Sequence, residues 1–479
     1  MDDRGASLYA WQAEALESWV QAGRSGIVEA VTGTGKTRVG QAAIGTALAE
    51  GRRAVVLVPT KELQRQWRST LRRALPGGVR VGLLGDGHRD DLHRCHALIA
   101  IIDSARLHGV AAPRGTLLVA DECHRYASRE SKRALIDEYE WRLGLTATLE
   151  RPDRAEHELL KYFGPVCYRI GYGRALTDAV VAQFALTLIG VPMAEHEAIK
   201  YESISRRISD LFKELTTVHG LPATPFHQFM RAVKEAAEES SWSPAQNSAR
   251  AFLGSVFERK NLMANSDSKF AVAVELAPAM WSADRTLIFT ESKDLAEDLA
   301  SALRSAHLTA AAIHSELGAS ERRNVFQRFS SGRLQVIVAP RVLDEGVDVP
   351  EADLAVIVSA SKTRRQMIQR MGRVLRRKDD GRLARIAILY LEGTTEDPSC
   401  GAHEAFLSEV TSVAEDLDDF GCDRLDDALA FLCVTDPIRP AQGPRMEGDP
   451  PRTNERAEVE DEAVAADEFL GLRSSEASL

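Results

Sequence analysis

The feature that most constrains the fold of this chain is a series of short apolar runs rich in β-branched residues, separated by stretches with helical periodicity. Continuous apolar strands that alternate with helices are typical of parallel sheets, because such strands are buried on both faces. A first series of runs lies at 26–31, 54–58, 97–102, 116–120 and 142–145, and a second at 285–290, 309–313, 335–339, 354–358 and 386–391. These runs predict an α/β protein with two parallel sheets.

The two series of runs divide the 479 residues into predicted segments. Between the sheets, apolar residues recur at helical spacing, as at Ile204, Ile208 and Leu215, which indicates a helical insertion. After residue 441, ten acidic residues accompany four arginines and few large apolar side chains, too little apolar surface to offset the entropy of ordering. The expected segments are an N-terminal lobe (1–174), a linker and helical insertion (175–283), a C-terminal lobe (284–395), a helical extension (396–435) and a disordered acidic tail (436–479).

Charge and composition limit the class of protein and its partners only broadly. The net charge is -10, but the tail carries much of it, so basic grooves remain possible elsewhere and bulk charge does not decide for or against nucleic acid. No apolar run approaches the roughly 18 residues that a membrane helix needs. The six cysteines are scattered, and arginine outnumbers lysine 48 to 12, as in proteins from GC-rich bacterial genomes. We therefore expect a cytoplasmic bacterial protein with no membrane partner.

The first run leads into a phosphate-binding pattern. Residues 30–37 read Ala-Val-Thr-Gly-Thr-Gly-Lys-Thr, a P-loop in which alanine replaces the usual first glycine, between a predicted strand and a predicted helix. Glycines allow backbone N–H groups to converge on a phosphate at a helix N-terminus, lysine neutralises the β and γ oxygens, and a threonine hydroxyl can bind Mg²⁺. The residues expected to bind the nucleotide are Thr32, Gly33, Thr34, Gly35, Lys36 and Thr37.

Two carboxylates follow the apolar run at 116–120. The sequence Asp121-Glu122-Cys123-His124 stands at the carboxyl end of that strand, where α/β sheets place groups that face a ligand. Alone, an Asp-Glu pair is more simply explained as the solvated cap of the next helix. Together with the P-loop, it predicts that Asp121 holds Mg²⁺ and that Glu122 orients, or takes a proton from, the water that attacks the γ-phosphate.

The order of the motifs resembles superfamily 2 helicases and translocases over about residues 8–395. The motifs are AVTGTGKT, VLVPTKEL, DECH, TAT, VLDEGVDVP and QRMGRVLRR, and the DECH sequence is similar to that of the XPB-like or restriction-motor-like branch. The resemblance implies two RecA-like lobes with one ATP and Mg²⁺ in the cleft between them. No second GK[ST] sequence occurs, so the second lobe is expected to supply only the other wall of that cleft.

The resemblance implies which residues of the second lobe face the nucleotide. Gln369, Arg373 and Arg376 lie near one face of a helix by their spacing. In the family, the two arginines are the arginine fingers and the glutamine contacts the γ-phosphate or its water, because charge accumulates there during hydrolysis. Gly346 and Asp348 match the family loop that senses ribose and phosphate.

Two further elements of the first lobe resemble family motifs. Gln12 matches the residue that reads adenine, and its amide offers both a donor and an acceptor, although an exposed helix residue is nearly as good an interpretation. Thr146 and Thr148 match the element that couples hydrolysis to movement of the lobes.

The resemblance also implies a set of residues after strands that contact the nucleic-acid backbone, with DNA favoured over RNA. Contacts to phosphate carry no sequence code, so they predict sequence-tolerant, salt-sensitive tracking along a strand. The residues are Thr60 before the helix that follows 54–58, Thr290 and Ser292 after 285–290, and His314 and Ser315 after 309–313.

These patterns predict a nucleic-acid-dependent ATPase, a DNA helicase or translocase. Two alternatives stay open. One is a double-stranded DNA translocase subunit that drives a partner nuclease or methyltransferase. The other is a nucleotide-switched nucleic-acid-binding subunit without unwinding, against which the intact Glu122, Arg373 and Arg376 argue.

Overall fold

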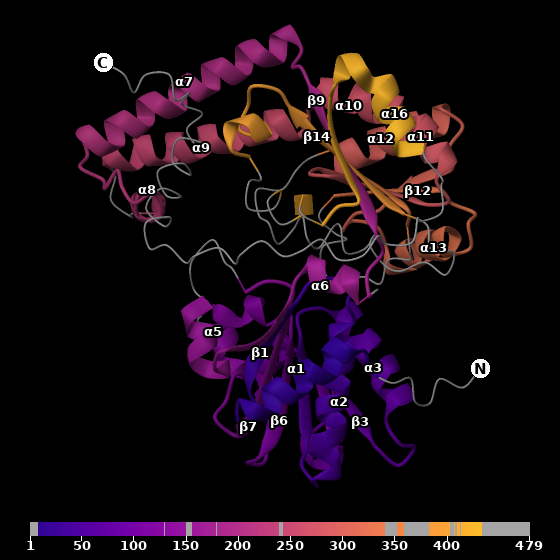
Figure 1. The fold of residues 1–479 in the computed structure, drawn as a ribbon. Helices are drawn as coiled ribbons and strands as arrows, with labels where there is room; N and C mark the ends of the chain where they lie inside the picture. Colours follow the sequence, from indigo (N-terminus) through magenta and orange to yellow (C-terminus); the bar gives the residue numbers. More distant parts are fainter. Residues whose placement is uncertain are drawn as a thin grey trace.

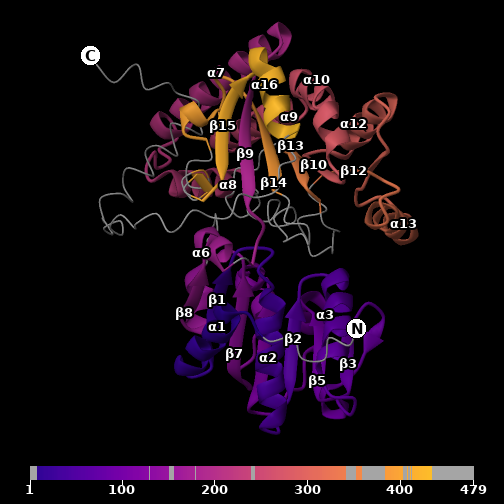
Figure 2. The ribbon, with the colours of Figure 1, turned by 45° about the vertical axis from the view of Figure 1, so that its right-hand side comes forward.

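The computed structural model describes residues 8–128, 130–149, 156–178, 180–238, 243–340, 352–358, 383–402, 407, 410–411 and 413–433. The predictions for the acidic tail and for five residues of the second lobe concern positions outside these ranges: Gly346, Asp348, Gln369, Arg373 and Arg376. The described chain forms two α/β lobes, with the first in indigo and violet and the second mainly in orange and yellow (Figures 1 and 2). The two parallel-sheet lobes predicted from the sequence are confirmed.

The first lobe is built on a sheet with the strand order β4-β3-β5-β2-β6-β7-β1-β8, parallel throughout except for the β3–β4 pair. Its strands are β1 (Ser25–Ala30), β2 (Ala54–Val58), β3 (Val81–Gly85), β4 (His88–Arg89), β5 (Ala97–Ile101), β6 (Thr116–Asp121), β7 (Tyr139–Thr146) and β8 (Val166–Ile170). Its α-helices are α1 (Ala10–Gln21), α2 (Lys36–Ala49), α3 (Lys61–Ala74), α4 (Ile102–His108), α5 (Glu156–Phe163) and α6 (Tyr172–Thr177). Every residue of β2, β5 and β6 is buried, which explains their unbroken apolar sequence.

The second lobe is built on a parallel sheet with the order β11-β12-β10-β13-β14-β9-β15. Its strands are β9 (Phe184–Val191), β10 (Thr286–Thr290), β11 (Ala310–Ala312), β12 (Val336–Pro340), β13 (Leu354–Ile357), β14 (Ala384–Leu391) and β15 (Asp416–Gly421). The helices that cover it are α10 (Asp267–Glu275), α11 (Ala277–Ser282), α12 (Lys293–Ser305), α13 (Ala319–Ser330) and α16 (Leu425–Cys433).

The two sheets share a strand order. The run β3-β5-β2-β6-β7-β1 of the first lobe corresponds to β11-β12-β10-β13-β14-β9 of the second. In the first lobe the P-loop and α2 connect β1 to β2. In the second lobe the helical insertion occupies the matching connection, from β9 to β10.

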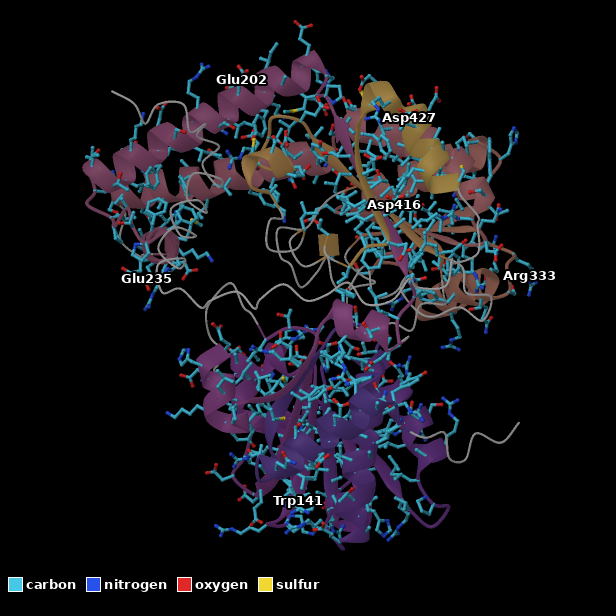
Figure 3. All side chains as sticks on the ribbon, viewed as in Figure 1. Trp141, Glu202, Glu235, Arg333, Asp416 and Asp427 are labelled. Carbon is cyan, nitrogen blue, oxygen red and sulfur yellow. The ribbon has the colours of Figure 1, made fainter. Side chains whose placement is uncertain are left out.

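The insertion has a hydrophobic core of its own. It consists of α7 (Glu195–Thr217), α8 (Phe226–Glu238) and α9 (Pro244–Ala264), where apolar residues such as Ile208, Phe229 and Phe252 are buried together. The charged residues Glu202 on α7 and Glu235 on α8 point to solvent (Figure 3). The helical spacing in the sequence therefore predicted these helices correctly.

The structure differs from the predicted segments at two strands. Residues 184–191, expected within the helical insertion, form β9, which pairs with β14 and β15 inside the second sheet. Residues 416–421, expected within a helical extension, form the edge strand β15. β9 is a buried apolar run among helical neighbours, whereas the three aspartates of β15 conceal its strand character. Among the described helices, none combines the length and apolar character needed to cross a bilayer.

Candidate functional site

The P-loop joins β1 to α2 at the carboxyl edge of the first sheet. Gly33 and Gly35 have φ of +88° and +82°, in the left-handed region where residues with a Cβ are strained. The helix begins at Lys36, so the loop directs its N–H groups toward the space above the strand ends. Thr32 and Thr37 lie half-buried at the two ends of the loop.

Two side chains of the loop fold back onto β1. The Lys36 ammonium donates to the carbonyl oxygen of Ala30 at 2.7 Å, and the Thr34 hydroxyl donates to that of Val31 at 2.7 Å. Burial lowers the pKa of Lys36, and the nearby carboxylates of Glu122 and Asp121 oppose that shift. The lysine is thus held beside the strand end, next to two acids.

Gln12 contacts the P-loop directly. Its side chain is fully buried, and Nε2 donates to the carbonyl oxygens of Thr34 and Gly35, each at 3.3 Å. Its Oε1 accepts from the backbone N–H of Tyr9 at 3.0 Å. The interpretation of Gln12 as an exposed helix residue is therefore wrong, and its role toward adenine stays a prediction.

Asp121 ends β6 and is only 5% exposed. Oδ2 accepts the indole N–H of Trp67 at 2.7 Å, and Oδ1 accepts the backbone N–H of Glu122 at 3.1 Å. Burial raises the pKa of Asp121, whereas the Trp67 hydrogen bond and the charge of Lys36 act in the opposite direction. The carboxylate orientation is fixed by two donors.

A chain of polar contacts leads from Glu122 to the TAT element. Glu122 has φ of +50°, a left-handed conformation that is uncommon outside glycine. Its carboxylate lies 3.4 Å from Nδ1 of His124, which lies 3.0 Å from the Thr146 hydroxyl; that hydroxyl donates to the Thr148 carbonyl oxygen at 2.7 Å. Because the Thr146 hydrogen is used there, its oxygen accepts, and His124 carries its proton on Nδ1.

The strand order explains why these groups meet. β6, β7 and β1 are neighbours and parallel, so the P-loop, Asp121 and Thr146 all leave the same edge of the sheet. The donor set also suits Mg²⁺, which prefers hard oxygen ligands, because a carboxylate and the hydroxyl of Thr37 lie at this edge.

The residues predicted to contact nucleic acid make contacts within the protein. Thr60 and Ser292 are helix N-caps, and their hydroxyls accept the N–H of Leu63 at 3.3 Å and of Leu295 at 3.2 Å. The Thr290 hydroxyl donates to the Ser292 carbonyl oxygen at 3.1 Å.

The remaining two residues of this set follow β11. His314 is buried, and its Nε2 lies 2.9 Å from a carboxylate oxygen of Glu297, whereas Ser315 is exposed. The roles of these residues toward a strand stay predictions.

Trp67 and His124 are site residues for which the sequence analysis predicted no role. Nothing in the sequence links Trp67 to Asp121, 54 positions away. The sequence could have indicated only that a buried tryptophan needs some acceptor for its indole N–H, without saying which one.

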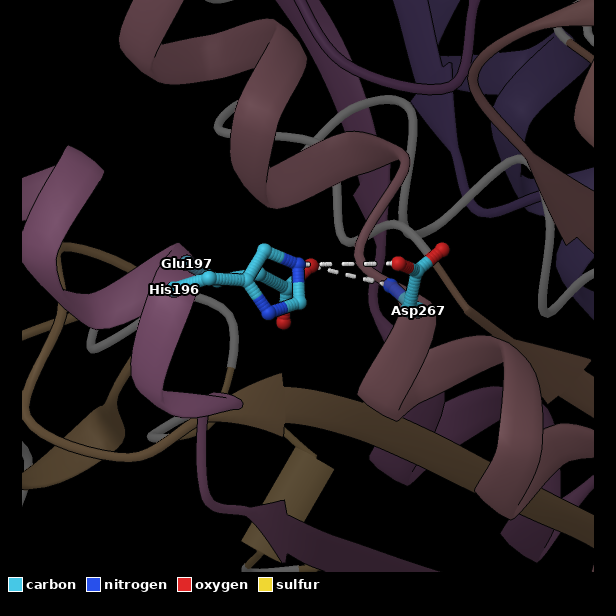
Figure 4. A group of neighbouring side chains, drawn as sticks. All are labelled: His196, Glu197 and Asp267. Atoms are coloured by element: carbon cyan, nitrogen blue, oxygen red, sulfur yellow. Dashed lines mark hydrogen bonds and ion pairs between the residues drawn. The ribbon is translucent and has the colours of Figure 1, made fainter.

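Among the described residues, one group of side chains has the composition of a metal centre: His196, Glu197 and Asp267 (Figure 4). The carboxylate of Glu197 is buried and accepts from the N–H of Asp267 at 2.9 Å and from the hydroxyls of Ser266 and Ser268 at 3.1 and 3.3 Å. This group caps the start of α10 and is explained by that structural role.

Family models match both lobes. The model described as "Type III restriction enzyme, res subunit" matches residues 6–151, and "Helicase conserved C-terminal domain" matches residues 268–378. Among solved structures, S. cerevisiae Dbp5 bound to RNA and ADP BeF3 is similar at a TM-score of 0.57 with 14% identity, covering 88% of this chain and 92% of that chain. The Pyrococcus furiosus Hef helicase domain is similar at 0.51 with 19% identity, covering 82% and 97%. The fold is therefore that of two-lobed, RecA-like helicases.

Curated relatives narrow this class. The DNA 3'-5' translocase XPB2 of Sulfurisphaera tokodaii is 30% identical over 374 residues, which cover 77% of this chain and 78% of that protein. The putative DNA 3'-5' helicase Rad25 of Haloarcula marismortui is 27% identical, and the DNA 3'-5' helicase XPB of Kineococcus radiotolerans is 27% identical; this chain spans 53% and 63% of their lengths. The chain belongs to the XPB-like DNA helicases and translocases of superfamily 2, as its motif order predicted.

Proposed function

We propose that this chain is a DNA-dependent ATPase that couples hydrolysis to movement along DNA. The observation that carries the proposal is the convergence of the P-loop, Asp121 and Glu122 on one edge of the first sheet. The names of the relatives, DNA translocase and DNA helicase, support DNA as the substrate.

The residues of the first lobe have distinct proposed roles. The P-loop N–H groups and Lys36 bind the phosphates, and Thr37 and Asp121 hold Mg²⁺, which would neutralise charge on the β and γ oxygens. Glu122 orients the attacking water and accepts its proton. The His124–Thr146 contact joins this acid to the coupling element.

The second lobe completes the site in this proposal. Arg373 and Arg376 stabilise the charge that develops on the transferred phosphoryl group, and Gln369 contacts the γ-phosphate or its water. Gly346 and Asp348 bind ribose and phosphate. Closure of the lobes on ATP and their reopening after hydrolysis, with different phosphate contacts in each lobe, would move the protein along a strand.

The test is steady-state phosphate release by the wild type and by Glu122→Gln, with and without DNA or RNA. We expect DNA to raise the wild-type rate and the variant to lose about a hundredfold or more. Equal rates for both proteins under all conditions would contradict the proposal.

A second candidate function is duplex DNA translocation that drives a partner nuclease or methyltransferase. The match of residues 6–151 to a restriction-enzyme subunit favours it. Displacement of a third strand from a triplex, without separation of a forked duplex, would select this candidate.

A further inference from the structure

Trp67 lies between the P-loop helix and the acid predicted to hold magnesium. It is fully buried in the middle of α3, and its indole Nε1–H donates to Oδ2 of Asp121 at 2.7 Å. Its ring also covers α2 at Gly40, where a Cβ would lie only 2.7 Å from the ring atom Cη2. The tryptophan therefore contacts both the helix that follows the P-loop and the acid predicted to hold magnesium.

The hydrogen bond restricts the carboxylate in a specific way. An indole nitrogen donates but does not accept, so this contact favours the ionised form of Asp121 as acceptor. A hydrogen bond to a charged acceptor is short and about twice as strong as a neutral one, and its length of 2.7 Å fits that class. With Oδ1 on the Glu122 N–H, the contact sets the plane of the carboxylate.

The packing around the ring makes this orientation rigid. Val119 of β6 and Leu145 of β7 also lie within 3.2 Å of the position of a Cβ on Gly40, so the glycine creates the space that the indole fills. Trp67 is fully buried in the same core cluster as Val119 and Leu145, and side chains in such cores interdigitate with few voids.

We infer that Trp67 is a positioning residue, which holds Asp121 in the orientation that binds magnesium-nucleotide. The inference rests on the proposed function, in which Asp121 is the magnesium ligand. Residues that hydrogen-bond a metal ligand contribute about 10- to 100-fold to metal affinity or activity. Trp67 acts only through Asp121 in this inference and touches no substrate.

Trp67→Phe tests the inference, because it removes the N–H and keeps most of the ring. Trp19→Phe is a matched control: Trp19 is fully buried in the same lobe, and its indole donates to the carbonyl oxygen of Arg142 at 3.0 Å. The measurement is the affinity of the full chain for a fluorescent ADP analogue, in Mg²⁺ and in EDTA, with a melting temperature for each variant.

We expect Mg²⁺ to tighten ADP binding in the wild type and in Trp19→Phe, and this gain to fall about tenfold in Trp67→Phe. Affinity in EDTA should be the same in all three proteins. In an Asp121→Asn background, Trp67→Phe should cause no further loss. Equal magnesium gains in Trp67→Phe and Trp19→Phe, or no gain in the wild type, would overturn the inference.

A second variant covers the case in which Trp67→Phe does not fold. Gly40→Ala keeps the indole but displaces it, so it should also reduce the magnesium gain, and an unchanged gain would overturn the inference. ADP binding requires no hydrolysis and no DNA. A wild type that binds magnesium-ADP but shows no DNA-stimulated ATPase therefore contradicts the motor proposal, while the Trp67 comparison still decides the inference.

Discussion

The two lobes share a strand order, yet their equivalent helices make different connections. In each lobe the central strand, β2 or β10, leads to a helix with a hydroxyl N-cap, Thr60 or Ser292. Seven residues later, about 10 Å along the helix, α3 carries Trp67 and α12 carries Leu299. Trp67 donates to Asp121, whereas Leu299 is buried in an apolar cluster.

This difference shows which part of the lobe each helix is bonded to. In the first lobe, α3 is bonded through Trp67 to Asp121, the proposed magnesium ligand. In the second lobe the cap itself makes the outward connection, since the Ser292 hydroxyl donates to Oδ1 of Asn265 at 2.6 Å, just after α9. In the first lobe, helix α3 is therefore bonded to Asp121. In the second lobe, the start of helix α12 is bonded to the end of the helical insertion.

The largest expected effect lies in the second lobe. Arg373→Ala should lower kcat for DNA-stimulated ATP hydrolysis by about a thousandfold, because an arginine finger stabilises charge on the transferred group. ADP affinity should change little, because ADP lacks the transferred phosphoryl group on which Arg373 acts in our proposal. Phosphate release and ADP titration measure the two quantities, and a normal kcat would contradict the proposed role of Arg373.

Leu299→Ala tests whether the residue of α12 that corresponds to Trp67 affects stability alone. The side chain is fully buried, so its truncation should lower the free energy of unfolding of the second lobe by about 3 kcal/mol, measured in urea. The magnesium gain in ADP binding should be unchanged, in contrast to Trp67→Phe. A loss of the magnesium gain in Leu299→Ala would contradict the conclusion that only α3 affects the magnesium ligand.

Thr146→Val removes the hydroxyl that joins His124 to the Thr148 carbonyl group. We expect the stimulation of the ATPase by DNA to fall about fivefold, in the range of coupling energies carried by such contacts. Thr187→Val in β9 is the control, because this threonine is also fully buried but its hydroxyl donates only to a local carbonyl oxygen, that of Leu188. The same loss in both variants would contradict a coupling role.

The smallest effects are expected at the helix caps. Thr60→Ala and Ser292→Ala should each cost about 1 kcal/mol of stability, since each leaves a backbone N–H without its side-chain acceptor. Only Ser292→Ala should also increase hydrogen exchange at the end of α9, because it removes the contact with Asn265. Unchanged exchange there would contradict the connection to the insertion.

The sequence predicted the elements that are determined by residues close together in the chain. Buried parallel strands such as β2 and β6 read as unbroken apolar runs, and the P-loop glycines occupy the left-handed positions that such a loop requires. Strand β15 was assigned to a helical extension because the exposed Asp416, Asp418 and Asp419 leave it without the apolar run of the other strands.

The contacts between distant residues could not be predicted from one sequence. The Trp67–Asp121 hydrogen bond depends on how α3 packs against β6, and the buried amide of Gln12 depends on how α1 lies against the P-loop. Periodicity places a residue on a face of its own helix but does not say which strand end that face meets.

Displacement of a labelled strand from forked duplex and triplex DNA measures whether this chain moves along DNA. We expect the wild type to displace a strand from at least one of these substrates with ATP and from neither with ADP. Glu122→Gln should displace a strand from neither substrate. DNA-stimulated hydrolysis without displacement from either substrate would contradict the proposed movement along DNA.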